Sequence, residues 1–271
     1  MQKNIRYIMV VCLLVTVIIL LQSGLMQYAA VLDFANEDTG TKDEIFREMH
    51  LPDEILNHAM QKNDYQLPVT WMYWQEAEGN YEATVGGYLQ NRLRFGLLPT
   101  KDAGRYASAY ETILADIEEF PVREDENGKY GWSYEDSWGN ARSYGGRRRH
   151  EGTDIMAENN ERGYFTIVSV SEGVVEKKGW LEQGGYRIGI RSPKGAYYYY
   201  AHLYDYADID IGDKVEAGDV LGYMGDTGYS KIEGTTGNFP VHLHFGIYLD
   251  LDNKETSVNP YYILRCIDEK K

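Results

Sequence analysis

The tripeptide His242-Leu243-His244 is the feature that most restricts how this chain can fold. Side chains two residues apart in a β-strand point to the same face of the sheet, so both imidazoles can reach one point. His150 and Asp154 are four residues apart and could share a face in extended backbone as well. His202 lies in a run of aromatic residues that also predicts a strand. The pattern predicts a β-sheet that gathers imidazole and carboxylate groups at one place.

These residue types point to metal chemistry. Three nitrogen or oxygen ligands with one open position make a catalytic zinc site, and spare imidazoles beside it supply acid–base groups. A lone histidine is more often a hydrogen-bonded core or surface residue, but four of the six histidines lie in the glycine-rich second half. The motif is not HExxH, because Gly152 and Thr153 disfavour the helix which that motif requires. Glu151 is therefore better explained as a solvated side chain than as a general base.

Composition narrows the class of partner. The chain has 271 residues, a formal net charge of -15 and a pI near 4.8. That charge argues against nucleic acid as a partner, since a polyanion is repelled, although solubility is its simplest explanation. The two cysteines, Cys12 and Cys266, lie far apart in the sequence, so we expect neither an intrachain disulfide nor a CxxC zinc knuckle.

The N-terminus predicts a membrane anchor. Lys3 and Arg6 precede an uncharged stretch over 7–32 that is long enough to cross a bilayer as a helix. Positive charge on its N-terminal side places that end inside and the rest of the chain outside a bacterial cell. A cleaved signal peptide, giving a secreted protein, is the alternative. The retained single-pass anchor is favoured because cleavage after Ala30 would place Tyr28 at the −3 position, where a small residue is needed.

Three segments follow from the patterns: a transmembrane segment over 1–32, a helical segment over 33–120 and a β-rich domain over 121–271. The polar stretch 35–43 is interpreted as a tether. Helix starts are predicted at Pro52 and at Leu67-Pro68, and a further helix over 101–120. Trp71 and Trp74 are more simply the core of a small helical bundle than a carbohydrate platform.

After Pro121, short β-rich runs separated by glycine-containing turns predict an antiparallel all-β domain, so the fold class is α+β. The expected strands cover 164–170, 173–177, 186–191, 196–202, 220–224 and 242–249. Alternation would place Tyr198 and Tyr200 on the same face as His202, with Tyr197 and Tyr199 on the other face.

An ordered series of motifs in this half supports a specific resemblance. The series comprises Trp138-Gly139 with Arg142, 150–157, 173–175, 184–186, 200–203, 212–218, 222–225, Thr227-Gly228, 242–245 and Asn259-Pro260. It resembles the lysostaphin-type (LytM-domain) zinc metallopeptidases, which cut peptidoglycan cross-links. The helical segment shows no such resemblance.

The resemblance implies that His150, Asp154 and His244 hold Zn²⁺, and that His202 and His242 lie beside the reacting water as acid–base groups. An imidazole with a pKa of about 6.5 can serve either role at neutral pH. Which of the two is the base and which stabilises the oxyanion stays open. The implied partners are peptidoglycan peptides and the membrane; a protein regulator is an open possibility.

Two departures from the family pattern carry their own expectations. The loop over 229–241 is longer than the usual connection before the HxH pair, and we expect its 234–237 section to be mobile and to form one wall of a groove. Gly246 stands where relatives often carry a larger residue, which predicts looser packing beside the metal. Arg147, Arg148 and Arg149 could attract a substrate carboxylate or simply form a solvated strand edge.

The sequence therefore predicts a membrane-anchored, extracytoplasmic zinc metalloendopeptidase that hydrolyses peptidoglycan stem peptides or cross-bridges. The alternative is a non-catalytic scaffold or regulator of the same family that binds wall or partner proteins. The sequence leaves open the bond cleaved, the role of 33–120, the need for an activator and the oligomeric state.

Overall fold

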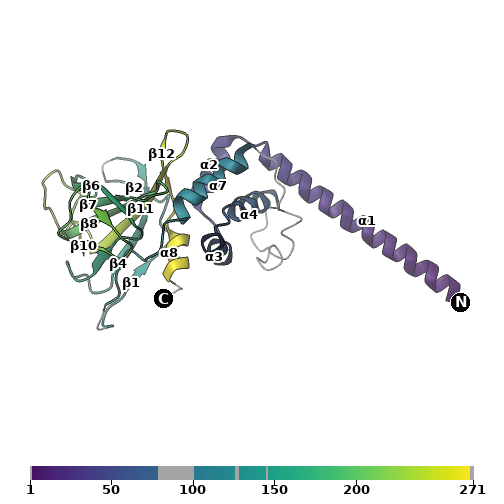
Figure 1. Cartoon of the computed structure of the whole chain (residues 1–271), viewed down its shortest axis with the longest axis horizontal. Coiled ribbons are helices and arrows are strands. Elements are labelled where there is room, and N and C mark those ends of the chain that lie inside the picture. The colour runs from purple at the N-terminus through teal and green to yellow at the C-terminus, as the bar shows by residue number, and fades with distance from the viewer. Residues whose placement is uncertain (1, 79–100, 126–127, 145, 269–271) are drawn as a thin grey trace.

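The computed structural model describes residues 2–78, 101–125, 128–144 and 146–268 (Figure 1). Helices occupy the first part of the chain, an antiparallel sheet follows, and one short helix ends it. The predicted α+β class is therefore confirmed. The helices are α1 (Gln2–Ala35), α2 (Thr39–Glu48), α3 (Asp53–Lys62), α4 (Gln66–Glu78), α7 (Lys101–Leu114) and α8 (Tyr261–Asp268).

Ten strands form one sheet with the order β1-β4-β11-β8-β7-β6-β9; β10 pairs with β5 and β8, and β12 with β11. They are β1 (Trp132–Tyr134), β4 (Thr153–Ala157), β5 (Thr166–Val168), β6 (Gly173–Leu181), β7 (Gly185–Arg191), β8 (Tyr197–Tyr206), β9 (Lys214–Val215), β10 (Val220–Met224), β11 (His242–Asp250) and β12 (Glu255–Val258). A separate pair joins β2 (Ala141–Arg142) to β3 (Arg148–Arg149). Each of the six predicted strands contains or overlaps an observed one.

The predicted helix starts agree with the structure. Helix α3 begins directly after Pro52, and α4 begins at Gln66, next to the predicted Leu67-Pro68 start. Helix α7 begins at Lys101 but ends at Leu114 rather than near Phe120, although Phe120 is still buried. Part of the predicted helical segment, 79–100, lies outside the described residues.

The predicted tether over 35–43 is wrong. Helix α1 ends at Ala35 and α2 begins at Thr39, so only a tight turn separates them. The Asp38 carboxylate caps α2 by accepting a hydrogen bond from Gly40 N, a role that short polar residues favour at a helix start. Phe34, near the end of α1, packs edge-on against Tyr73 of α4 with ring centroids 5.1 Å apart. The polar residues of this stretch therefore cap a helix and do not form a linker.

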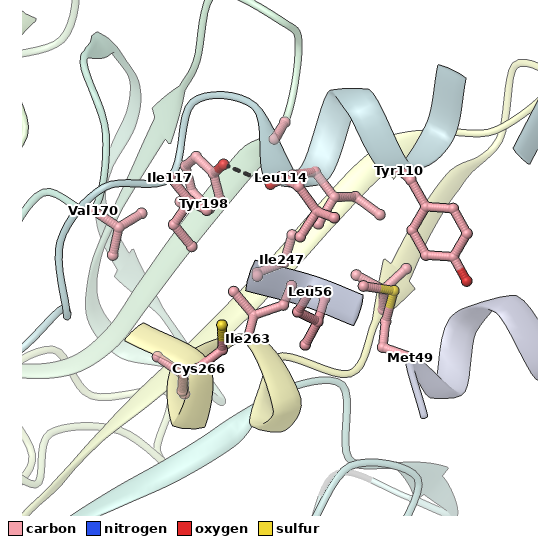
Figure 2. Close-up of a cluster of buried hydrophobic side chains, with 14 of the residues drawn as sticks. Met49, Leu56, Tyr110, Leu114, Ile117, Val170, Tyr198, Ile247, Ile263 and Cys266 are labelled. Carbon is pink, nitrogen blue, oxygen red and sulfur yellow. Dashed lines mark hydrogen bonds between the residues drawn. The ribbon is translucent and has the colours of Figure 1, made fainter. Parts of the chain in front are cut away.

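The core joins the helices to one face of the sheet. Tyr198 and Ile247 of the sheet lie among side chains of α3, α7 and α8 in Figure 2, and the Tyr198 hydroxyl donates to Ile113 O at 3.0 Å. Trp71 and Trp74 are buried in the same continuous core, which confirms the simpler interpretation of the tryptophans. The face of the sheet that carries Tyr198 and Tyr200 is thus covered.

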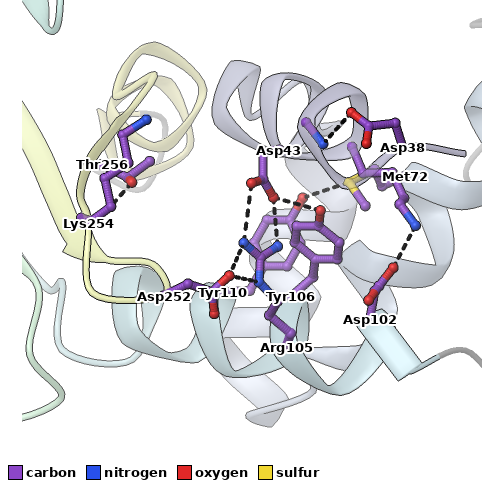
Figure 3. Close-up of polar contacts among 12 residues, drawn as sticks. Asp38, Asp43, Met72, Asp102, Arg105, Tyr106, Tyr110, Asp252, Lys254 and Thr256 are labelled. Atoms are coloured by element: carbon purple, nitrogen blue, oxygen red, sulfur yellow. Dashed lines mark hydrogen bonds and ion pairs between the residues drawn. The ribbon is translucent and has the colours of Figure 1, made fainter.

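A polar contact ties the helices to the far end of β11. Arg105 of α7 donates to Asp43 of α2 at 2.6 Å and to Asp252, in the turn before β12, at 2.7 Å (Figure 3). The Tyr106 hydroxyl donates to the same Asp43 carboxylate at 2.8 Å. This network connects α7, α2 and the sheet.

Candidate active site

Three side chains on neighbouring strands converge on one point. His244 of β11 stands directly opposite Asp154 of β4 in the ladder, and His150 lies just before β4. His150 Nε2 is 3.0 Å from Asp154 Oδ1 and 2.9 Å from His244 Nδ1, and His244 Nδ1 is 3.0 Å from Asp154 Oδ1. These atoms therefore form an almost equilateral triangle.

The triangle fits a divalent metal. Two imidazole nitrogens and one carboxylate oxygen form a donor set typical of catalytic zinc, and ligands about 2 Å from a tetrahedral ion are roughly 3.3 Å apart. His150, Asp154 and His244 thus make a possible metal site. The second ring nitrogen of His150 donates to Ser137 O at 3.0 Å, which orients the ring and leaves Nε2 to act as a ligand.

The carboxylate of Asp154 is held in its charged form. Burial by itself would raise its pKa, but hydrogen bonds with His150 and His244 lower that pKa far below its usual value. Arg142 adds an ion pair, with Nη2 2.5 Å from the other carboxylate oxygen, Oδ2. In the sequence, Arg142 stands out only as part of a motif, because nothing in its spacing connects it to Asp154.

His202 and His242 lie beside this triangle. Their rings are 4.7 Å apart between centroids, and His242 Nε2 is 3.8 Å from Asp154 Oδ1. Each ring is fixed through Nδ1, which donates to Thr227 O in His202 and to Pro240 O in His242, at 2.7 and 2.8 Å. Burial lowers the pKa of both imidazoles below the ordinary value, so the metal-free site holds them neutral at neutral pH.

The predicted face of His202 is wrong. Tyr198 and Tyr200 point into the core, whereas His202 lines the cleft together with Tyr197 and Tyr199. A β-bulge causes the change: the β7–β8 register passes from Ile188 opposite Tyr200 to Tyr186 opposite Leu203, so Ala201 and His202 together face one residue of β7. His202 has a φ of 63°, and this left-handed backbone turns its ring to the site.

The five residues open into a cleft of about 490 Å³. Tyr229, from the 229–241 loop, lines it and stacks on Tyr144 at 4.3 Å between centroids. The start of the loop therefore forms a wall, whereas the 234–237 section, for which the wall was predicted, does not line the cleft. Phe239 packs against His202 at 4.6 Å. Internal hydrogen bonds order the loop, including Gly237 N to the Asp226 carboxylate at 2.9 Å and Gly228 N to Thr235 O at 3.0 Å.

Two glycines control close packing beside the triangle. A Cβ on Gly152 would lie 2.7 Å from the His244 ring and 2.5 Å from Phe245 O, so only glycine allows this approach. A Cβ on Gly246 would lie 2.8 Å from the Tyr248 ring. The expected looseness at Gly246 is therefore wrong, because Tyr248 fills the space.

The arginines before His150 have separate contacts. Arg149 lines the cleft and pairs with Glu44 of α2 at 2.9 Å, while Arg148 lines it with a weak contact to Tyr144 O at 3.4 Å. The interpretation as a purely solvated strand edge does not hold for these two. Glu151 is exposed and also lines the cleft.

Comparison with known proteins places this arrangement in a family. A family model described as Peptidase family M23 matches residues 148–260, which contain all five predicted site residues. An L-Ala--D-Glu endopeptidase of Bacillus subtilis (strain 168) is 47% identical over 147 residues, 54% of this chain and 42% of that protein. Lysostaphin of Staphylococcus simulans is 31% identical over 101 residues, 36% of this chain and 19% of lysostaphin. The chain spans less than half the length of either relative.

Among solved structures, a lytM protein from Ruminococcus gnavus ATCC 29149 has a TM-score of 0.67 and 41% sequence identity. The match covers 83% of this chain and 90% of that one. Such coverage extends beyond the sheet into the helical segment, for which the sequence by itself indicated no relative.

Proposed function

This chain belongs to peptidase family M23, and on that premise we propose that it is a membrane-anchored, extracytoplasmic zinc endopeptidase acting on peptidoglycan peptides. The observation that carries the proposal is the triangle of His150 Nε2, Asp154 Oδ1 and His244 Nδ1 in the cleft. These three residues would hold Zn²⁺. When bound, zinc polarises the peptide carbonyl and lowers the pKa of water to about 7.

His202 and His242 would move protons during hydrolysis. Both Nδ1 atoms are engaged with backbone carbonyls, which leaves each Nε2 to accept or donate a proton at the reacting centre. One imidazole would accept the proton of the attacking water at Nε2 and then pass that same proton to the departing amine, and the other would lie beside the developing oxyanion. Such groups contribute roughly 10²- to 10⁴-fold in rate. The assignment between the two histidines stays open.

The first bond to test is L-Ala–D-Glu, because a relative at 47% identity is named for it. Tyr229 of the loop and the sheet tyrosines that line the cleft, Tyr197, Tyr199 and Tyr248, would then surround a short, acidic peptide. Stem peptides and cross-bridges are the substrate class.

Helix α1 supports the proposed location. It is the one described helix that is long and apolar enough to cross a membrane, over Arg6–Ala35. A signal sequence passes the same test, so the retained anchor is part of the proposal. With positive residues on its N-terminal side, the cleft would lie outside the cytoplasm.

The test is digestion of purified peptidoglycan by the full chain in detergent with Zn²⁺, followed by mass spectrometry of the released peptides. New N-termini at one bond type are the expected result. A chain that binds one zinc ion and releases nothing would overturn the enzymatic proposal in favour of a non-catalytic scaffold. A His202→Ala chain is the matched control for contaminating hydrolases.

A further inference from the structure

Three cations line the cleft without an ion-pair partner among the described residues. Two others are committed, Arg142 to Asp154 and Arg149 to Glu44. Arg148, Lys177 and Arg187 line the same cleft, and none of them forms a salt bridge within the described part of the chain. In a chain with net charge -15, free acidic groups are plentiful, so unpaired cations gathered in a cleft point to an anionic ligand.

Arg187 is the centre of this group. It stands on β7 opposite the bulge at Ala201 and His202, so it belongs to the strand next to the acid–base histidine. Its Nη1 atom is buried and has no hydrogen-bond partner. A buried guanidinium nitrogen without an acceptor is costly. Nothing within the described structure neutralises this side chain, which also lines the cleft, where a carboxylate can pair with it.

The neighbouring tyrosines cannot supply the missing negative charge. Burial raises the pKa of Tyr197 to about 12, and Arg187 is the largest charge opposing that rise. Burial raises the pKa of Tyr199 as well, against the charges of Arg187 and Arg148. Both hydroxyls are neutral at neutral pH, and both rings lie near these cations. Lys177 lies over the Tyr197 ring, with Nζ 5.4 Å from its centroid.

The two glutamates of the cleft, Glu151 and Glu255, lie around a different side chain. Burial raises the pKa of Tyr248, and the charges of Glu151 and Glu255 add to the rise, which places both carboxylates near that ring. Neither of them forms an ion pair with Arg148, Lys177 or Arg187 in the described structure.

We propose that Arg187, assisted by Arg148 and Lys177, binds a free carboxylate of the substrate peptide and selects an acidic residue adjacent to the cleaved bond. The inference rests on the proposed peptidase function, because it assigns the specificity of the same cleft. A glutamyl residue linked through one carboxyl group keeps its other carboxyl free, and a guanidinium can bind it through two parallel hydrogen bonds. The neutral carboxamide of the same residue should bind less well.

The test uses two synthetic peptides that differ only in this group, one with L-Ala–D-Glu and one with its carboxamide, L-Ala–D-isoglutamine. The full chain in detergent with Zn²⁺ should show a kcat/KM at least about tenfold higher for the acid than for the amide, in the range of a charge-assisted hydrogen bond. Arg187→Gln should remove that preference by slowing the acid peptide while leaving the amide within about threefold. Lys177→Met should reduce the preference in part.

Arg191→Gln is the matched control, since Arg191 lies four residues farther along the same strand and over the same Tyr197 ring but pairs with Glu176. It should keep the acid preference. An acid-to-amide ratio unchanged in Arg187→Gln, in a variant with wild-type thermal unfolding, would overturn the proposal.

A binding measurement separates this proposal from the proposed function. Isothermal titration of both peptides into the metal-free chain involves no cleavage, and wild type should bind the acid more tightly than Arg187→Gln does. Should neither peptide be cleaved with zinc present, the peptidase function fails, and the titration still decides the carboxylate site. Equal affinities for acid and amide in wild type would reject that site.

Discussion

At the scale of single residues, the four histidines of the cleft fall into two groups by their contact with Asp154. His150 and His244 direct a ring nitrogen to Asp154, whereas His202 and His242 stand beside that group. His150→Ala should therefore abolish stoichiometric zinc, because two remaining ligands cannot hold a catalytic ion. His202→Ala should retain zinc and lose about 10²- to 10⁴-fold in kcat.

Elemental analysis and peptide hydrolysis on the same preparations separate these effects. Loss of zinc from His202→Ala, or full zinc content in His150→Ala, would contradict the division of roles.

Buried imidazoles also set the acid sensitivity of the metal-free protein. Burial lowers the pKa of His244 to about 4, while an unfolded histidine titrates near pH ~6.5. As the pH falls between these values, the unfolded state takes up the proton first, so the free energy of unfolding should decline. Above about pH 6.5 it should be independent of this residue.

Urea unfolding of the metal-free chain at about pH 7.5 and about pH 5 measures the effect. A His244→Gln chain should lose less stability over that interval than wild type. An equal loss in both chains would assign the acid sensitivity to other groups.

The residues of the site were predictable from the sequence to the extent that they lie in regular strands. His242 and His244 follow strict alternation, and Asp154 is the register partner of His244. His202 did not follow alternation, because a bulge and a left-handed backbone are not visible in a pattern of polar and apolar residues. Arg142 reaches Asp154 twelve residues farther along, and Arg187 lines the cleft only because β7 lies beside β8, so no local spacing encodes either position.

At the scale of elements, the start of β4 must approach β11 closely for His150, Asp154 and His244 to come together. Gly152 allows this approach because it has no Cβ. Gly152→Ala should push the His244 ring away and weaken zinc binding at least about tenfold. Competition with a zinc-binding dye gives the affinity. Gly104→Ala is the control, because a Cβ there meets nothing within 4 Å and alanine favours the helix. Wild-type zinc affinity in Gly152→Ala would contradict the packing argument.

Helix starts were predictable because their cause is local: Pro52 and Asp38 act within one turn. Helix ends and short elements were not. The end of α7 at Leu114 and the eight-residue α8 depend on tertiary packing, not on a local signal. Ile263 and Cys266, for example, hold α8 in place through their burial. The polar stretch before α2 looked like a linker because capping residues and linker residues have the same composition.

At the scale of the whole molecule, the helices and the cleft use opposite faces of the sheet. Tyr198 faces α7, whereas Tyr197 and Tyr199 line the cleft. No described helix lines the cleft itself, and α2 reaches its rim through the ion pair of Glu44 with Arg149. The described helices therefore support the sheet from behind and leave the cleft open to a polymer.

The anchor predicts a fractionation result. The full chain expressed in bacteria should sediment with membranes and resist extraction by alkaline carbonate. The reason is that a helix of the length of α1 spans a hydrocarbon core of about 30 Å. Intact-mass analysis should show the uncleaved N-terminus. A soluble product shortened near residue 30 would support the signal-peptide alternative instead.

The tight turn between α1 and α2 has a consequence for reach. An enzyme joined to its anchor by a flexible linker can reach substrate over a range of distances from the membrane. Here the membrane helix instead continues into the packed helices through the contact of Phe34 with Tyr73. Under the proposed orientation, this rigid connection holds the cleft at a nearly constant distance from the membrane. Such an enzyme would cleave the layer of peptidoglycan at that distance and would not reach peptidoglycan that lies farther out.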